Sequence, residues 1–258
     1  MHSVGDMSWR TAAIYCNWLH NKSVERSAFL NGAYDVSTFG DSFPAGLSDQ
    51  RTRHPDARYW IPSWDEWLKA AHYDASMLNP DGSEGGWWRY ANMSNVVLTY
   101  GPPRAGQANS ANGNPSILLG SYPPQLSPWG LLDTAGCTAE WSEEIGYQGF
   151  VPTFRYFDGS AWPDSLGTAR TGDRISYPGG NYPSIATLDY GVRIATTVPP
   201  PGTCSLGVGL ILWGTVRRRR SQESIATERV RSSSPFLESS MPRSFETLIL
   251  TPTAHTPS

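Results

Sequence analysis

The chain has 258 residues, enough for one large domain with appendages, and it contains 11 Trp, 12 Tyr, 25 Gly and 21 Pro but only 17% charged residues. This composition argues against a helical bundle and favours a loop-rich fold packed by aromatic side chains, each of which buries a large area. The formal net charge of −3 argues against nucleic acid as a partner, because phosphate binding needs a basic face.

Cysteine and histidine usage and the first residues restrict the protein class further. The three cysteines, Cys16, Cys137 and Cys204, are too few and too scattered for a disulfide framework. The five histidines include no pair at the spacing of metal ligands on a helix. Residues 1–20 contain no basic start followed by an apolar run, so no signal peptide is visible there.

A first amphipathic helix is predicted from Ser8, which can cap it, to about Asn21. Its apolar positions follow the spacing i, i+3, i+4 and i+7, which places them on one face: Ala12, Tyr15, Cys16 and Leu19. We interpret Cys16 as a small buried hydrophobic residue of this face rather than a reactive thiol. Residues 22–58 are polar and irregular, which predicts a long surface excursion.

A second helix is predicted from about Trp64 to Tyr73. Ser63 and Glu66, three residues apart, form the pattern of a capping box. Asp65 and Glu66 lie in the first turn, where carboxylates interact favourably with the helix dipole, so neither needs a catalytic role. From residue 79 to 122 the chain is rich in turn formers, and four asparagines have turn positions as their commonest explanation: Asn92, Asn109, Asn112 and Asn114.

Residues 127–141 carry two carboxylates, Asp133 and Glu140, around a turn at Gly136. Calcium binds six to eight oxygens in loose geometry, so such a loop with free carbonyls can hold this cation. An ordinary loop with solvated carboxylates is the alternative, because the segment lacks a regular calcium-loop motif. Residues 146–196 predict short strands and loops, and residues 190–195 a final strand.

The composition changes after Thr197. Residues 198–203 form a proline-rich spacer, residues 204–216 are uncharged and mostly apolar, and four arginines follow at 217–220. The apolar run is shorter than the roughly 20 residues of a membrane-spanning helix. A buried core helix is the alternative, but the adjacent arginines favour a membrane end, with residues 1–200 outside and the arginines in the cytoplasm. Residues 221–258 are rich in Ser, Thr, Pro and Arg, which predicts disorder.

Six sequence blocks, in order, resemble those of the formylglycine-generating enzymes, the sulfatase-modifying factor family. Residues 130–141, Gly-Leu-Leu-Asp-Thr-Ala-Gly-Cys-Thr-Ala-Glu-Trp, are similar to the family's GLYDMAGNVWEW, with Cys137 in place of Asn. The other blocks lie at residues 2–19, 59–71, 89–92, 179–181 and 191–195. The resemblance implies an irregular, loop-rich α+β fold related to C-type lectins over residues 1–196, with two amphipathic helices and short antiparallel strands.

The resemblance also implies a copper-dependent oxidation, but this sequence lacks the cysteine pair that the reaction requires. The family oxidises a sulfatase cysteine to formylglycine, using copper held by two cysteines shortly after the block that corresponds to residues 179–181. Soft thiolates are suitable ligands for Cu(I). Because residues 179–196 contain no cysteine, copper is not expected here, and we assign no catalytic residue.

The family's two calcium sites transfer better to this sequence. One would use the side chains of Asp133 and Glu140 and the carbonyls of Gly136 and Thr138. The other would use the Asn92 side chain and the Met93 carbonyl, with a further oxygen from residues 109–114. We therefore expect structural calcium.

The tail at 198–220 resembles a PEP-CTERM sorting signal, with Pro200 where that motif has Glu, and 38 residues follow it. Because the sequence starts inside the first family block, we expect an N-terminally truncated domain whose export signal lies upstream. The predicted function is a non-catalytic, calcium-stabilised binding module at the cell envelope, with an unknown protein or glycan ligand, the membrane contacted through residues 204–216, and no nucleic acid. A formylglycine-generating oxidase and a purely structural surface protein are the alternatives.

Overall fold

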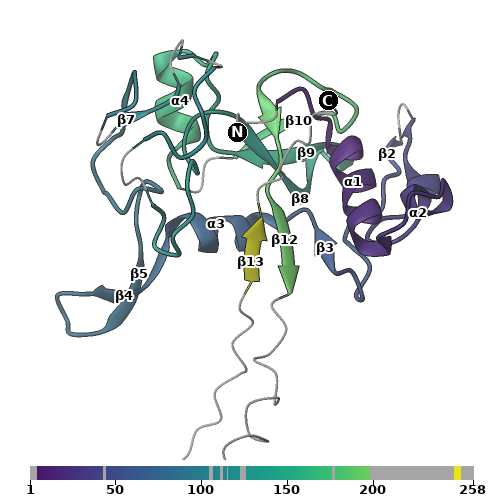
Figure 1. Cartoon of the computed structure of the whole chain (residues 1–258), viewed down its shortest axis with the longest axis horizontal. Helices are drawn as coiled ribbons and strands as arrows, with labels where there is room; N and C mark the ends of the chain where they lie inside the picture. Colours follow the sequence, from purple (N-terminus) through teal and green to yellow (C-terminus); the bar gives the residue numbers. More distant parts are fainter. Residues whose placement is uncertain are drawn as a thin grey trace, which may run out of the picture. The chain divides into compact units, whose positions relative to one another are not determined.

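The computed structural model describes residues 5–42, 45–104, 107–110, 113–114, 116–122, 126–175, 178–197 and 247–250. The chain divides into two compact units, of which the first comprises Met1–Thr197 with Thr247–Ser258 and the second Val198–Glu246. Every helix and strand of the described residues belongs to the first unit (Figure 1). The predicted spacer, apolar run and arginine cluster lie outside the described residues.

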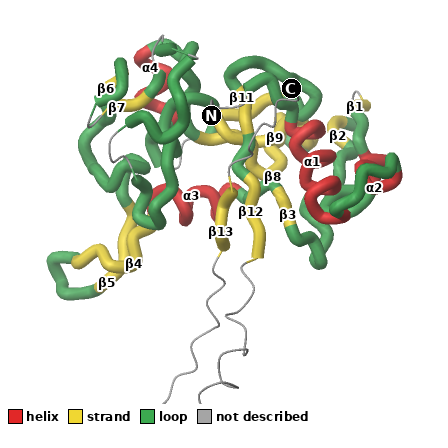
Figure 2. Tube along the Cα trace, viewed as in Figure 1, coloured by secondary structure: helices red, strands yellow, loops and turns green. Residues whose placement is uncertain are grey.

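The first unit combines short helices and short strands with long loops, as the sequence predicts (Figure 2). The helices are α1 (Trp9–Asn21), α2 (Ser27–Leu30), α3 (Trp64–His72) and α4 (Leu166–Gly172), with a 3-10 turn, η1 (Val36–Thr38). The strands are β1 (Asp41–Ser42), β2 (Gly46–Leu47), β3 (Tyr59–Trp60), β4 (Tyr73–Leu78), β5 (Glu84–Trp87), β6 (Thr99–Tyr100), β7 (Gln107–Ala108), β8 (Ala139–Gln148), β9 (Val151–Asp158), β10 (Gly179–Asn181), β11 (Tyr190–Gly191), β12 (Ile194–Thr197) and β13 (Thr247–Leu250). The α+β prediction is confirmed. Among the described residues, no helix is long and apolar enough to cross a membrane.

Both predicted amphipathic helices are present with the predicted caps. The Ser8 hydroxyl accepts a hydrogen bond from the Thr11 amide (3.0 Å) at the start of α1, and Cys16 is fully buried on its inner face. The capping box of α3 is complete, with Ser63 and Glu66 each accepting from the other's amide. The helix ends at His72, one residue earlier than predicted, because Tyr73 has extended backbone and begins β4.

A four-stranded sheet of order β10-β9-β8-β11 forms the centre of the unit. Strands β8 and β9 form an antiparallel hairpin, and β11 runs parallel to the start of β8. The single final strand predicted at 190–195 is wrong. Residues 190–191 pair with β8, whereas Ile194–Thr197 form β12 in a second sheet, because Val192 and Arg193 between them turn the chain from one sheet to the other.

The second sheet has the order β13-β12-β3. Strand β13 pairs antiparallel with β12 over four residues. The prediction of disorder over 221–258 is therefore wrong for Thr247–Leu250. This run has strong β propensity, and the free edge of β12 supplies the hydrogen-bonding partner that a tail judged alone lacks. The rest of that tail lies outside the described residues.

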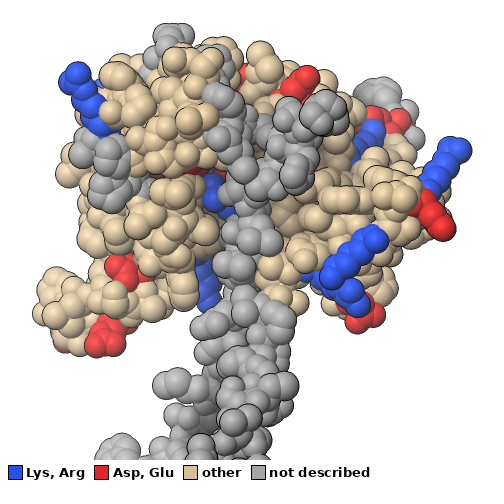
Figure 3. All heavy atoms as spheres, viewed as in Figure 1, with Lys and Arg blue, Asp and Glu red and all other residues tan. Residues whose placement is uncertain are grey.

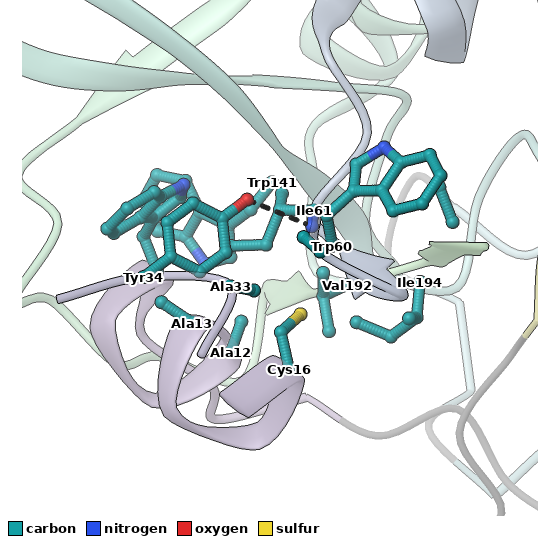
Figure 4. Close-up of a cluster of buried hydrophobic side chains, with 13 residues drawn as sticks. Ala12, Ala13, Cys16, Ala33, Tyr34, Trp60, Ile61, Trp141, Val192 and Ile194 are labelled. Carbon is teal, nitrogen blue, oxygen red and sulfur yellow. Dashed lines mark hydrogen bonds between the residues drawn. The ribbon is translucent and has the colours of Figure 1, made fainter. Parts of the chain in front are cut away.

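The main hydrophobic core packs α1 against these two sheets (Figure 4). Trp141 is fully buried, and its ring makes an edge contact with Phe157 and a tilted contact with Tyr190. Tyr34 is also fully buried, and its hydroxyl donates to Glu143 (2.9 Å) and accepts from the Ile61 amide (3.2 Å). The predicted surface excursion at 22–58 is thus wrong at Tyr34. The aromatic residues of this polar run are scattered and show no strand or helix periodicity that reveals the burial of Tyr34. The prediction of strands and loops over 146–196 is likewise wrong at α4, because the sequence Leu-Gly-Thr-Ala-Arg-Thr-Gly has no apolar helical period to indicate a helix.

Candidate functional site

The loop before β8 adopts an unusual backbone and is attached to a second loop. Asp133, Gly136 and Cys137 have positive φ values of 53°, 78° and 64°. The Cys137 amide donates to the Asn109 carbonyl (2.8 Å). A Cβ at Gly136 would lie 2.8 Å from the Asn109 amide nitrogen, so only glycine permits this close approach.

Asp133 is half-buried and lines a small cavity of about 10 Å³ together with Asn92, Gln107 and Tyr122. One carboxylate oxygen of Asp133 accepts a hydrogen bond from the Gly120 amide (2.6 Å), and burial raises the pKa of this carboxyl. The Oδ1 atom of Asn92 is buried and accepts no hydrogen bond from the described residues. The structure therefore brings Asn92 and Asp133, assigned by the resemblance to two different calcium sites, to one cavity.

Glu140 has a different environment, because its carboxylate is paired with Arg193. The Oε1 atom accepts from Nη2 of Arg193 (2.7 Å), and Oε2 accepts from Nε of Arg193 (2.9 Å) and from the Trp67 indole (2.7 Å). The same Nη2 also donates to the carbonyls of Leu132 (3.1 Å) and Asp133 (3.3 Å). The guanidinium thus binds both the carboxylate and the carbonyls of the loop where a second cation site was predicted.

The remaining predicted ligands are backbone carbonyls, that of Met93 next to Asn92 and those of Gly136 and Thr138 in the loop before β8. The Thr138 side chain is buried, and Met93 has a positive φ of 55° with its side chain 43% exposed. The side-chain amide of Asn109 forms hydrogen bonds within its own turn. Its oxygen accepts from the Asn114 backbone amide (2.9 Å), and its nitrogen donates to the Asn114 carbonyl (2.9 Å). Asn112 lies outside the described residues.

The donor set fits a hard cation at the Asn92 cavity better than at Glu140. Amide and carboxylate oxygens are the ligands calcium prefers, and the cavity is about the size of one ion or water. Within the part of the chain that the structure describes, no group of three His, Cys, Asp or Glu side chains could hold a metal. A cation in this cavity would therefore depend on backbone carbonyls and water for most of its ligands.

Two buried carboxyl groups near this loop had no signal in the sequence. Asp158 accepts from the Trp64 indole (2.6 Å) and the Gly159 amide (2.8 Å), and burial raises its pKa to about 7. Asp173 accepts from the Tyr100 hydroxyl (3.0 Å), and burial likewise raises its pKa to about 7. The side-chain partners, Trp64 of Asp158 and Tyr100 of Asp173, are distant along the chain, so spacing alone does not identify either group.

The two described cysteines lie in different parts of the first unit. Cys16 belongs to the main core, whereas Cys137 lies in the loop next to Asn109, and neither is disulfide-bonded. Burial raises the pKa of Cys16 well above its usual value and that of Cys137 to about 12. Buried thiols of this kind resist forming the thiolate that a soft metal needs.

Comparison with known proteins gives the family. Residues 2–198 match the model of the sulfatase-modifying factor enzyme 1-like domain. Among solved structures, the chain is similar to CarF, with 23% identity and a TM-score of 0.48 over 75% of this chain and 66% of that chain. It is also similar to Treponema denticola variable protein 1, with 19% identity and a TM-score of 0.44 over 74% of this chain and 69% of that chain.

The chain therefore spans slightly less than two thirds of the length of the CarF structure. No curated protein matches the sequence. The family match extends over nearly the whole first unit, including the loop of residues 130–138 and the segment after β10. This chain belongs to the sulfatase-modifying factor enzyme 1-like family.

Proposed function

We propose that this chain is a non-catalytic member of its family that serves as a calcium-stabilised binding module. One observation carries the proposal: residues 182–196, which follow β10, contain no cysteine. Copper-dependent oxidation of a sulfatase cysteine needs a pair of thiolates on the enzyme. Residues 182–196 contain no methionine either, so no other soft sulfur ligand replaces the thiolates there.

The two buried cysteines support the same proposal. Cys16 and Cys137 lie in different parts of the unit and both have raised pKa values. Neither presents a thiolate to solvent or to a common metal. An oxidase in this chain would need a copper site built from other ligands.

Structural calcium is the second part of the proposal. Its support is the cavity lined by both Asp133 and Asn92, where the buried Oδ1 atom of Asn92 accepts no hydrogen bond from any residue that the structure describes. A buried acceptor of this kind costs free energy unless a cation or water contacts it. We assign Asn92 and Asp133 as the side-chain ligands, with backbone oxygens supplying further contacts.

We further propose a place at the cell envelope. The support is in the sequence, where a proline spacer at 198–203 and an apolar run at 204–216 precede four arginines. A domain held there would present its surface to a protein or glycan ligand. A purely structural surface protein would differ only in lacking that ligand.

A turnover assay tests the non-catalytic role. The chain is incubated with copper, a reductant and a cysteine-containing sulfatase-motif peptide, and the peptide is analysed by mass spectrometry. We expect no formylglycine and no stoichiometric Cu(I) binding. Formylglycine product from the wild-type chain would overturn the proposal, and its loss in Cys137→Ser would then identify the thiol responsible.

A further inference from the structure

The β4–β5 hairpin projects from the first unit as a separate two-stranded sheet (Figures 1 and 2). Tyr73 at the start of β4 lies opposite Trp87 at the end of β5. Both strands are attached at the end of α3. Strand β4 begins directly after His72, the last residue of the helix, and the Trp88 amide, just after β5, donates to the His72 carbonyl (3.0 Å). The base of the hairpin is therefore fixed.

Three aromatic side chains meet at this base, and we call them the hairpin aromatic surface: Tyr73, Trp87 and Trp129. The rings of Tyr73 and Trp87 have centroids 5.0 Å apart. The Trp129 indole donates to the Tyr73 carbonyl (2.8 Å). A Cβ at Gly85 would lie 2.7 Å from the Tyr73 hydroxyl, so glycine at this position leaves the ring room to lie across β5.

This surface is exposed although its residues are of the type that proteins bury. Trp87 is 50% exposed and Trp129 is 51% exposed. Each aromatic ring is held by a neighbour, so little side-chain entropy remains to be lost on binding. Exposed, fixed Trp and Tyr side chains are typical of the residues that dominate the energy of protein interfaces.

The charge of the hairpin is uniformly negative. Asp74, Asp81 and Glu84 lie on it, and residues 70–88 contain no Lys or Arg. Hydrogen bonds from Ser76 to Asp74 and from Ser83 to Asp81 lower the pKa of both carboxyls, which keeps them ionised. His72 is buried, and burial lowers its pKa to about 4, so it adds no positive charge at neutral pH. Figure 3 shows acidic atoms on the projecting hairpin at the lower left.

We propose that the hairpin aromatic surface binds an arginine- or lysine-bearing segment of a partner protein. Cationic groups would stack on the faces of Trp87 and Trp129, where the ring quadrupole attracts them. The carboxylates of Asp74, next to Tyr73, and of Asp81 and Glu84, toward the far end of the hairpin, would attract further cationic groups of the same segment. Charge complementarity selects this partner over nucleic acid and acidic polysaccharides, which the three carboxylates repel. This inference rests on the proposed role as a binding module and names the site and the chemistry of its ligand.

Isothermal titration calorimetry on the full chain tests the proposal with a twelve-residue alternating Gly-Arg peptide as the probe. We expect binding that weakens at least tenfold in Trp87→Ala, is largely retained in Trp87→Phe, and weakens as salt rises. Asp81→Asn combined with Glu84→Gln should also weaken binding and reduce the salt dependence, while the amide oxygen introduced at position 81 preserves the acceptor that holds Ser83. Phe150→Ala is the matched control, because Phe150 is fully exposed on the distant β8–β9 turn, and it should bind as wild type does.

The proposal would be overturned if the wild-type chain did not bind the Gly-Arg peptide, or if wild type and Trp87→Ala bound it equally. A matched Gly-Glu peptide should not bind. Preferential binding of a neutral oligosaccharide such as cellohexaose, lost in Trp87→Ala, would also overturn it and assign the surface to glycans. These outcomes are independent of the turnover assay, since formylglycine formation would refute the non-catalytic role without removing a peptide site on the hairpin.

Discussion

Around α1, β8 and β12, thirteen buried side chains form one hydrophobic cluster, whereas the segment from residue 88 to 138 contributes three buried residues, Tyr90, Leu98 and Ala108, to a cluster of its own. We call the first the aromatic core and the second, with the neighbouring residues 158–175, the loop region. In the loop region, buried polar groups take the place of apolar ones, including Asn109 and Asp173.

This difference indicates how each part is stabilised. Apolar burial contributes roughly 25 cal/mol per Å² and does not depend on the ionisation of any group, so the aromatic core should be stable under most conditions. Buried carboxylates and amides stabilise only when every partner is present. The loop region should therefore depend on pH, on the Arg193 ion pair and on a bound cation.

The largest effect is expected in the aromatic core. Trp141 is fully buried, and its indole donates to the Met7 carbonyl (2.7 Å). Trp141→Ala should lower the free energy of unfolding by about 3–5 kcal/mol, because it leaves a cavity and an unpaired acceptor. Chemical denaturation measures it, and Phe150→Ala, at a fully exposed site, should stay within about 0.5 kcal/mol of wild type. If Trp141→Ala lowered the free energy of unfolding less than Asp133→Ala does, the aromatic core would not be the more stabilising of the two parts.

Arg193 connects the two parts. It lies between β11 and β12, directly before the core residue Ile194, and pairs with Glu140 at the loop. Arg193→Met should cost about 3–5 kcal/mol, because Glu140 would remain buried without its counter-charge. The double variant Arg193→Met with Glu140→Gln should recover much of this loss in the same denaturation experiment. If the double variant is no more stable than the single one, the unpaired charge is not the cause.

Calcium should stabilise the loop region. At a calcium concentration one hundred times the Kd, linkage predicts about 2.7 kcal/mol, which corresponds to a rise in Tm of about 5–10 °C for a domain of this size. Differential scanning calorimetry of the full chain, with calcium and after chelation, measures this rise. Magnesium is the matched control, because it tolerates such irregular geometry poorly.

The variants Asp133→Ala and Asn92→Ala should each abolish the calcium-dependent rise. If Asn92→Ala kept the calcium-dependent rise in Tm, calcium would bind outside the cavity that Asn92 and Asp133 line. Melting curves that do not change on chelation, in wild type and Asp133→Ala alike, would contradict calcium binding.

The smallest predicted effect is a pH dependence at Asp173, whose pKa is raised from 3.8 to about 7 in the folded chain. Between these two values the folded state holds a proton that the unfolded state lacks, so stability falls as pH rises. The loss should be about 2 kcal/mol between pH 5 and 7, at about 1.4 kcal/mol per pKa unit. Asp173→Asn should remove this dependence, and its stability relative to wild type should increase from pH 5 to pH 8.

The variant and wild type are compared at each pH because other groups titrate too. His72 has a lowered pKa of about 4 and destabilises the fold as pH falls below 6.5, and Asp158 titrates in the same direction as Asp173. His72 is common to the two proteins and cancels in the difference. Asp158 interacts electrostatically with Asp173, so the comparison is repeated with Asp158→Asn present in both proteins. A difference that stays constant from pH 5 to pH 8 would contradict the raised pKa of Asp173.

Features with local causes were predictable from the sequence. The helices α1 and α3 were predicted with their caps, because Ser8, Ser63 and Glu66 act within one turn of their own helix. The family and the α+β fold followed from six short blocks in the right order, each of which is weak evidence alone. The lack of a cysteine in residues 182–196 is also a property of the sequence, and it carries the proposed function.

The tertiary structure decided the features that join distant residues. The family resemblance implied that Glu140 and Asp133 would share a cation. In the structure the guanidinium of Arg193, 53 residues away, binds Glu140, and Asp133 lines a cavity with Asn92. Burial of Asp173 and exposure of Trp87 contradict the usual preferences of their residue types. Such placements depend on which loops pack together. Because the free energy of packing is a sum over contacts between residues far apart in the chain, a local sequence pattern cannot predict them.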